Sequence, residues 1–176
     1  MLKPKVLEAL NTHLNYEFYS AYSYLAMSTW LESQGLPGCG KWMHVQGQEE
    51  LLHAHKFYRY ILDRDAEVEL FAIDKPAQKW KDVHEVFRQS YQHECQVTER
   101  INALMDAALQ NSDHATTNFL QWFVTEQVEE EATLREILDK LKLIGKDSSA
   151  LLLLDQDLGG RALTVPGAAG AAAGKG

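Results

Sequence analysis

The chain has 176 residues, of which 45% are hydrophobic and 24% charged, and these values fit one globular domain with a buried core. Its formal net charge of -8 argues against nucleic acid as a main partner, because binding a phosphate backbone requires a basic surface. The longest apolar run near a helix, residues 150–154, is too short to cross a bilayer, so we expect no membrane partner.

Glycine, proline and capping residues divide the chain into five predicted helices. Four of these helices are long, and the fifth is short because paired glycines follow it. The predicted helices cover residues 4–34, about 37–65, about 80–110, the stretch from the 111–113 turn to 144, and a segment between a cap at Asp147 or Ser148 and Gly159.

The joints between the helices predict the topology. The first and third joints are short, which makes the helices on either side of each antiparallel neighbours. The middle joint, residues 66–79, has no helical rhythm. A helix of about 27 residues is roughly 40 Å long, and about 14 extended residues reach roughly 45 Å, so this joint can cross the whole bundle. We therefore predict an all-α four-helix bundle with one long crossover and a short fifth C-terminal helix.

Each long helix carries apolar residues at three- and four-residue spacing, and glutamate interrupts this buried stripe on every one. The interruptions lie within about one turn (~3.6 residues) of each helix midpoint, so in a bundle they share one height. They are Glu17, Glu50 with His53, Glu94, and Gln127 with Glu130. Taken singly, each of these residues fits an ordinary helix position, and it is their common height that indicates a site.

Four carboxylates at one level of a core need partners, because an unpaired buried carboxylate is strongly destabilising. No Lys or Arg lies on the stripes near this level, which leaves protonated carboxyls or two divalent cations to balance the charge. Oxygen-rich ligation with one imidazole suits iron or manganese, while zinc would bind without redox chemistry. Glu50 and His53, three residues apart on one face, can bind one ion while Glu50 bridges to a second.

Six pieces of the sequence resemble the bacterial non-haem ferritins, and the resemblance extends over about residues 1–158. They are Leu2-Lys3-Pro4, Asn15-Tyr16-Glu17, Gln48-Glu49-Glu50-x-x-His53, Tyr91-x-His93-Glu94, Asn118-Phe119-Leu120-Gln121-Trp122 and Glu126-Gln127-x-Glu129-Glu130-Glu131. The resemblance implies a ferritin-like bundle and a shell of twenty-four subunits that encloses a mineral cavity.

The resemblance also implies which residues hold iron. It assigns one iron to Glu17, Glu50 and His53. It assigns the second iron to Glu50, Glu94 and Glu130, with Gln127 beside it.

A third iron site and a neighbouring tyrosine follow from the same resemblance. Glu49, Glu126 and Glu129 look like the family's third site, joined to the pair through Glu130, and a solvated charged face is the alternative. Tyr24 looks like the family's tyrosine beside the di-iron centre, with a packing role as its alternative.

No haem is expected. Bacterioferritins carry Glu-x-x-His on both paired helices, whereas the second motif here is Gln127-x-x-Glu130. They also place a haem-ligating methionine shortly after the first such glutamate, where this sequence has Leu51 and Leu52.

The expected function is iron storage and detoxification. A ferroxidase site within each subunit would oxidise Fe(II) with dioxygen or hydrogen peroxide, and the homo-oligomeric shell would hold the Fe(III) mineral. A di-iron enzyme acting on an organic substrate is one alternative, although Tyr24, Phe57 and Phe123 fill the space beside the site. A non-catalytic shell or DNA-protecting miniferritin is another, although such proteins usually place their ligands between subunits.

Three expectations concern the periphery of the molecule. We expect residues 1–160 to form the di-iron domain and the Ala/Gly-rich residues 161–176 a mobile tail. The leucines of the fifth helix, Leu151, Leu152, Leu154 and Leu158, would be exposed in a monomer and pack against symmetry mates. The N-terminus has no secretory signal, and Cys39 and Cys95 show no metal-ligand spacing, so a cytoplasmic protein with free thiols is expected.

Overall fold

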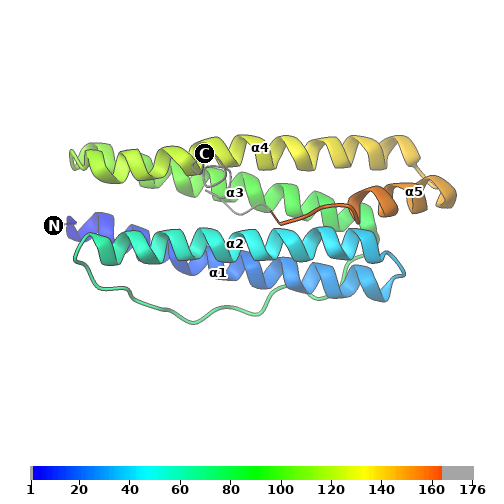
Figure 1. The fold of residues 1–176 in the computed structure, drawn as a ribbon, viewed down its shortest axis with the longest axis horizontal. Helices are drawn as coiled ribbons and strands as arrows, with labels where there is room; N and C mark the ends of the chain where they lie inside the picture. Colours follow the sequence, from blue (N-terminus) through cyan, green and yellow to red (C-terminus); the bar gives the residue numbers. More distant parts are fainter. Residues whose placement is uncertain (1, 164–176) are drawn as a thin grey trace, which may run out of the picture.

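The computed structural model describes residues 2–163, which form five helices and no strand (Figure 1). The long helices are α1 (Pro4–Ser33), α2 (Pro37–Asp63), α3 (Val83–Gln110) and α4 (His114–Ile144), and the short one is α5 (Ser148–Leu158). α1 packs against α2 and α3 against α4, each pair antiparallel. The predicted all-α bundle with one crossover and a short fifth helix is confirmed. None of the described helices is long and apolar enough to cross a membrane.

Local chemistry sets where each helix begins. α1 and α2 begin with Pro4 and Pro37, at a position where the missing backbone N–H is not needed. The other helices follow Asp82, Asp113 and Asp147, whose carboxylates accept hydrogen bonds from backbone N–H groups of the first turn. The sequence predicts α3 from about residue 80, and the helix begins three residues later because Asp82 holds the cap position in extended backbone.

The connection between α2 and α3 runs the length of the bundle beside α1 (Figure 1). Asn11 of α1 holds it through two hydrogen bonds: Oδ1 accepts from the backbone N–H of Glu69 at 2.9 Å, and Nδ2 donates to the carbonyl of Glu67 at 3.2 Å. One turn later, Nδ2 of Asn15 donates to the carbonyl of Ala72 at 3.3 Å. These side chains satisfy backbone groups of an extended segment that has no strand partner.

The core of the bundle consists of two apolar halves. One half contains Tyr24, Met43, Phe87 and Leu134, and the other contains Leu14, Phe57, Val97 and Phe123. Along every long helix, polar side chains separate the residues of one half from those of the other. The buried ones are Glu17 and Ser20 from α1, Gln46, Glu50 and His53 from α2, Ser90 and Glu94 from α3, and Gln127 from α4.

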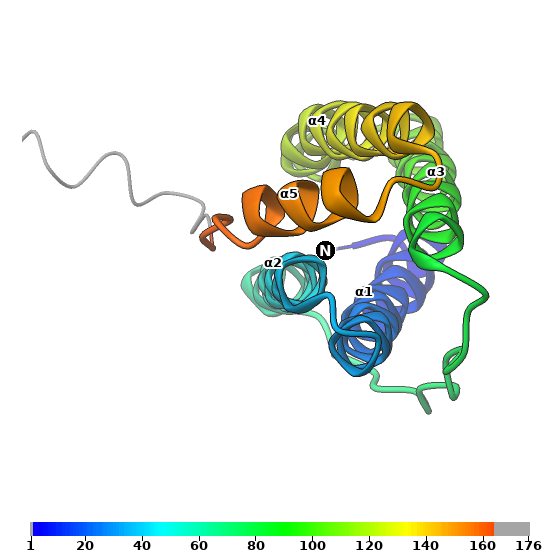
Figure 2. The same ribbon diagram turned by 90° about the vertical axis from the view of Figure 1, so that its right-hand side faces the viewer.

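α5 lies between α4 and the first turns of α2 (Figure 2). Leu154 and Leu158 are buried against the core of their own subunit, so the expectation that they are exposed in a monomer is wrong. They point inward because Asp155, between them in sequence, anchors α5 to the start of α2. Leu152 is 54% exposed and is the residue of the predicted set that faces away from the core. Of the predicted tail, residues 164–176 lie outside the described residues.

The carboxylate of Asp155 caps α2 from outside the helix. It accepts hydrogen bonds from the backbone N–H groups of Gly38 at 3.1 Å and Cys39 at 2.8 Å. The two helices approach so closely that a Cβ at Gly38 would lie 1.7 Å from the carbonyl oxygen of Asp155. Glycine is therefore required at position 38 for α5 to dock.

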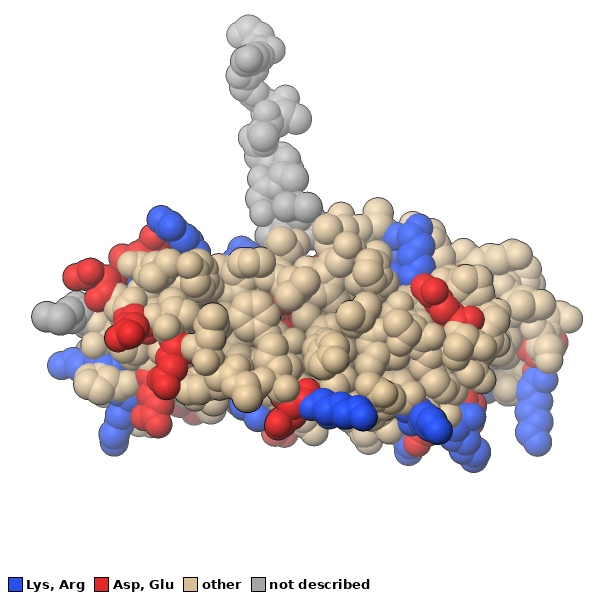
Figure 3. Space-filling view, turned by 90° about the horizontal axis from the view of Figure 1, so that it is seen from below, with Lys and Arg blue, Asp and Glu red and all other residues tan. Residues whose placement is uncertain are grey.

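One face of the molecule has most of its charged side chains near the rim and a broad uncharged middle (Figure 3). Large apolar side chains are exposed on α1 and on the crossover. They include Tyr22, Leu25, Leu70, Phe71 and Ile73.

Candidate metal centre

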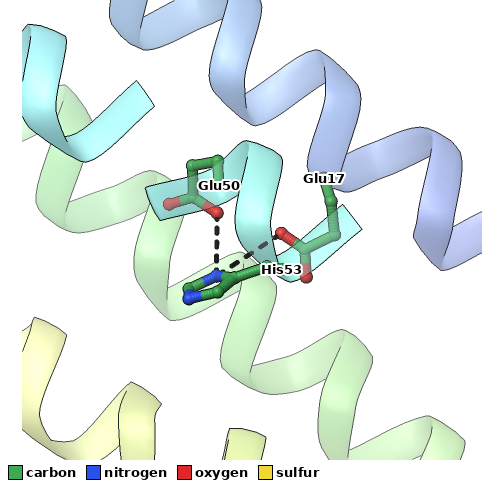
Figure 4. Close-up of side chains that lie close together, drawn as sticks. All are labelled: Glu17, Glu50 and His53. Carbon is green, nitrogen blue, oxygen red and sulfur yellow. Dashed lines mark ion pairs between the residues drawn. The ribbon is translucent and has the colours of Figure 1, made fainter. Parts of the chain in front are cut away.

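Glu17, Glu50 and His53 face one another between α1 and α2 (Figure 4). Nδ1 of His53 lies 3.3 Å from Oε2 of Glu50 and 4.0 Å from Oε2 of Glu17. All three residues are buried, and their ligand atoms lie within 4.8 Å of one another. Two carboxylates and one imidazole in this arrangement can hold one divalent cation.

A second group of ligand atoms adjoins the first. Atoms of Glu50, Glu94 and Glu130 also lie within 4.8 Å of one another, so Glu50 belongs to both groups and can bridge two cations. Gln127 borders the second group, because its Nε2 donates to the backbone carbonyl of Glu94 at 3.2 Å and to Oε2 of Glu94 at 3.1 Å. Tyr24 donates its hydroxyl to Oε1 of the same carboxylate. The structure thus brings together the residues that the sequence places at one height.

Two oxygen atoms of this layer have no hydrogen-bond donor. Oε2 of Glu17 and Oε2 of Glu130 are buried and accept no hydrogen bond from residues 2–163, whereas Oε1 of Glu17 lies 2.8 Å from Nε2 of His13. Buried polar atoms are costly when they lack a partner, and carboxylate oxygens are good ligands for hard cations. The unpaired oxygens therefore fit the two cations that the geometry can hold.

The carboxyl groups of the layer respond differently to burial. Burial, reinforced by the negative charges of Glu94 and Glu17, raises the pKa of Glu50 well above its usual value. Burial, together with the charges of Glu94 and Glu50, does the same to the pKa of Glu130. Burial would also raise the pKa of Glu17. The charge and hydrogen bond of His13, the charge of His53 and a side-chain interaction with Glu50 together outweigh burial, and the net pKa of Glu17 is lowered.

Two residues, His13 and Gln46, contact the carboxylates of this layer in ways that were not predicted from the sequence. Nε2 of His13 lies 2.8 Å from Oε1 of Glu17, and the available signal was the four-residue spacing between them on α1. Nε2 of Gln46 donates to Oε1 of Glu50 at 3.2 Å and to Oε1 of Glu130 at 3.1 Å. Its position one turn before Glu50 on the same face of α2 was the corresponding signal. Gln46 therefore links two carboxylates of the second group.

The residues predicted as a third iron site line one cavity of about 340 Å³ on the outer side of this layer, together with Glu130. They are Glu49, Glu126 and Glu129. Ligand atoms of His53, Glu126 and Glu130 lie within 4.8 Å of one another, and Glu49 and Glu129 join no such group within the described part of the chain.

Glu49 is paired with an arginine. The guanidinium of Arg161, two residues beyond the Gly159 cap of α5, forms an ion pair with the Glu49 carboxylate and lines the same cavity. From the sequence, Arg161 is expected in a mobile tail, and no Lys or Arg is expected near the site on the buried stripes of the four long helices. The guanidinium of Arg161 lies at the site because α5, which precedes it, folds back onto α2.

Comparison with known proteins gives the family. A family model described as the ferritin-like domain matches residues 7–144. The bacterial non-heme ferritin of Campylobacter jejuni is 42% identical over 156 residues, which cover 89% of this chain and 93% of that protein. A probable bacterial non-heme ferritin-like protein of Haemophilus influenzae is 40% identical, with 90% of this chain and 96% of that protein covered.

Solved structures agree with this. An engineered closed form of the Archaeoglobus fulgidus ferritin is 47% identical and superposes with a TM-score of 0.92, covering 93% of this chain and 100% of that one. The open-pore ferritin of the same archaeon, also 47% identical, gives a TM-score of 0.91 over 92% of this chain and 100% of that one. The resemblance to bacterial non-haem ferritins is confirmed. The chain belongs to the ferritin family.

Proposed function

We propose that this chain oxidises Fe(II) at the paired ligand groups and stores the Fe(III) product as a mineral inside an oligomeric shell. One observation carries the proposal: two groups of buried ligand atoms share Glu50 in the polar layer between two apolar halves of the core. Relatives that are named ferritins support iron as the ion.

In this proposal each iron has its own ligands. Glu17, Glu50 and His53 bind the first ion, and Glu50, Glu94 and Glu130 bind the second. Gln127 and Tyr24, which both donate hydrogen bonds to Glu94, orient that carboxylate toward the second ion. The cluster of Glu49, Glu126 and Glu129 with Glu130 forms a third site.

Ferrous iron is the substrate, and dioxygen or hydrogen peroxide is the oxidant. Two ferrous ions supply two electrons, which with two protons reduce one dioxygen to hydrogen peroxide or one hydrogen peroxide to two waters. The fixed carboxylates stabilise the more highly charged ferric product better than the ferrous substrate. Glu50 and Glu130, whose pKa values are raised, would release protons when metal binds.

The shell belongs to the same proposal. α1 and the crossover expose large apolar side chains, among them Tyr22 and Leu70. A stable monomer seldom leaves so much apolar surface in water. We propose that this surface contacts neighbouring subunits in a shell of twenty-four. The free thiols of Cys39 and Cys95 fit a reducing compartment such as the cytoplasm.

An organic substrate is less well supported by the site. Such an enzyme needs an apolar pocket beside the metals, and Tyr24, Phe57 and Phe123 are fully buried around the ligands. The ring of Phe123 meets that of His53 edge-on, with centroids 5.9 Å apart. Size-exclusion chromatography separates the two functions, since a storage shell elutes at hundreds of kilodaltons and an oxygenase of this size as a monomer or dimer.

Kinetics of ferrous oxidation test the site directly. His53→Ala and Glu94→Ala should each slow the initial rate of ferric formation in air at least several-fold, because each removes a ligand. His55→Ala, an exposed histidine on the same helix, is the matched control and should oxidise iron at the parental rate. Unchanged rates in both ligand variants would contradict the site assignment.

A further inference from the structure

Three residues of α2 hold the guanidinium of Arg161. Nη2 donates to the carboxylate of Glu49 and, at 2.8 Å, to Oε1 of Gln46. The guanidinium carbon lies 4.1 Å from the ring centroid of Trp42, which adds a cation–π contact. Nη1 is buried and has no hydrogen-bond partner among residues 2–163. Arg161 is therefore seated in the cavity and is not a freely rotating surface side chain.

The backbone that carries Arg161 is anchored close by. The cap from Asp155 to the backbone N–H groups of Gly38 and Cys39 fixes α5 on α2. Nζ of Lys41 donates to the carbonyl of Gly159 at 2.8 Å, and this residue lies only two positions before Arg161. The position of the guanidinium thus follows from how α5 docks on α2.

The guanidinium stands among carboxylates that a metal would need. Glu49, Glu126, Glu129 and Glu130 line the same cavity of about 340 Å³ as Arg161. A divalent cation bound by Glu49 would strongly repel the guanidinium of Arg161 at contact distance, and this repulsion favours displacement of Arg161 from that carboxylate. Arginine and metal are therefore alternative occupants of this cluster.

Displacing Arg161 would also affect the paired site. Gln46 accepts a hydrogen bond from Arg161 through Oε1, while its Nε2 donates to Glu50 at 3.2 Å and to Glu130 at 3.1 Å. Arg161 thus helps to keep the amide of Gln46 turned with its donor toward the carboxylates of the second group. An amide that lost this contact could rotate and release the two carboxylates.

We propose that the guanidinium of Arg161 occupies the cluster of Glu49, Glu126, Glu129 and Glu130 in the metal-free subunit and competes with a metal ion for this third site. The inference rests on the proposed function for the identity of the cluster as a third site, and it adds the residue that controls its occupancy. Arg161 is a positioning residue: of the cluster's carboxylates it contacts Glu49, and it leaves that carboxylate when metal binds.

Calorimetric titration of the assembled, metal-free protein with Zn²⁺ tests this, since zinc binds without redox chemistry. The parent should show two tight ions per subunit and a weaker third. Arg161→Gln should bind the third ion on the order of tenfold more tightly, because apparent affinity falls in proportion to the fraction of sites already occupied. Arg59→Gln, which removes an exposed arginine from α2, is the matched control and should leave all three affinities unchanged.

Two further variants separate competition from a structural role. Arg161→Met keeps a long side chain over Trp42 but no charge, so it should tighten the third ion as Arg161→Gln does. Adding Glu129→Gln to Arg161→Gln should abolish the gain, because the third ion then lacks a ligand.

A third affinity that is the same in Arg161→Gln, Arg161→Met and the parent would overturn the inference, even if the two tight ions bind normally. A gain that survives Glu129→Gln would overturn it as well, because the ion would then bind elsewhere. Absence of the two tight ions from the parent would instead contradict the proposed function, so the two failures are distinguishable.

Discussion

Replacing Glu130 with glutamine should stabilise the metal-free protein near neutral pH. Oε1 of Glu130 accepts a hydrogen bond from Gln46 at 3.1 Å, and a glutamine can keep that acceptor. Its amide NH₂ would then stand in place of Oε2, which is buried without a donor, and could donate to the carboxylates of Glu50 and Glu94. The substitution removes one charge from a crowded group and converts an unpaired acceptor into a donor.

The size of the effect follows from the distances in the second group. Its ligand atoms lie within 4.8 Å of one another, and two unit charges at that distance repel by about 3.5 kcal/mol at an effective dielectric constant of ~20. Protonation of the parent relieves part of this repulsion. We therefore expect the Glu130→Gln variant to gain about 1–3 kcal/mol, and each kcal/mol raises Tm by roughly 2–4 °C for a chain of this length.

The gain should depend on pH. Burial and the charges of Glu94 and Glu50 raise the pKa of Glu130, so the native state holds a proton that the unfolded chain has released. Below the ordinary glutamate pKa of about 4.3, Glu130 is protonated in both states and its charge does not destabilise the parent. As pH rises above that value toward the raised native pKa, the free energy of unfolding of the parent falls, whereas glutamine does not titrate. The advantage of the variant should therefore be larger at pH 8 than at pH 5.

Thermal melts with chelator and with Zn²⁺ provide the assay. Glu136→Gln removes a charge from the same helix at a side chain that is 69% exposed, and as the control it should change stability by no more than about 0.5 kcal/mol. The Glu130→Gln variant should also gain less stability from zinc than the parent, because the second site has lost a ligand. A variant that melts below the parent in chelator, or responds fully to zinc, would refute the reasoning about this carboxylate.

Three other outcomes are expected. Asp155→Ala removes the cap that joins α5 to α2 and should cost about 1–2 kcal/mol, seen as a lower Tm, and an unchanged melt would show that the cap is dispensable. Gly38→Ala should lower Tm further, because its Cβ would meet the carbonyl of Asp155 at 1.7 Å, and a parental Tm would contradict the close approach of the two helices. Tyr24→Phe leaves Oε1 of Glu94 without its donor, so we expect slower iron oxidation with two zinc ions still bound; parental rates would leave Tyr24 only a packing role.

The fold and the height of the ligands follow from features that a sequence displays directly. Helical spacing places Glu17, Glu50 and Glu94 on buried faces, and similar helix lengths bring them to one level because short joints align the helix ends. The length of the crossover then fixes the bundle topology. Each of these features depends on residues close in sequence or on counting residues along one helix, whose rise per residue is constant.

What the sequence does not reveal depends on how distant segments pack. The Ala/Gly-rich composition of residues 161–176 predicts that Arg161 begins a tail. Its partner Glu49 lies more than a hundred residues earlier, so the sequence gives no sign of their contact. From the sequence, Leu154 and Leu158 are predicted to be exposed. The hydrogen bond between Asp155 and Gly38 buries them by docking α5 on α2, and no periodic pattern in the sequence shows that these two distant segments meet. His13 is one turn from Glu17, but an apolar stripe does not show that an imidazole will turn toward a carboxylate.

The central claim is that one subunit binds two ferrous ions at groups sharing Glu50 and oxidises them there. An anaerobic ferrous titration of the assembled protein, followed by a pulse of oxygen, tests it most directly. We predict saturation at two tightly bound ions per subunit, with a weaker third, and ferric formation far faster than for free Fe(II) in the same buffer. Binding without saturation at two ions, or oxidation no faster than that of free iron, would contradict it.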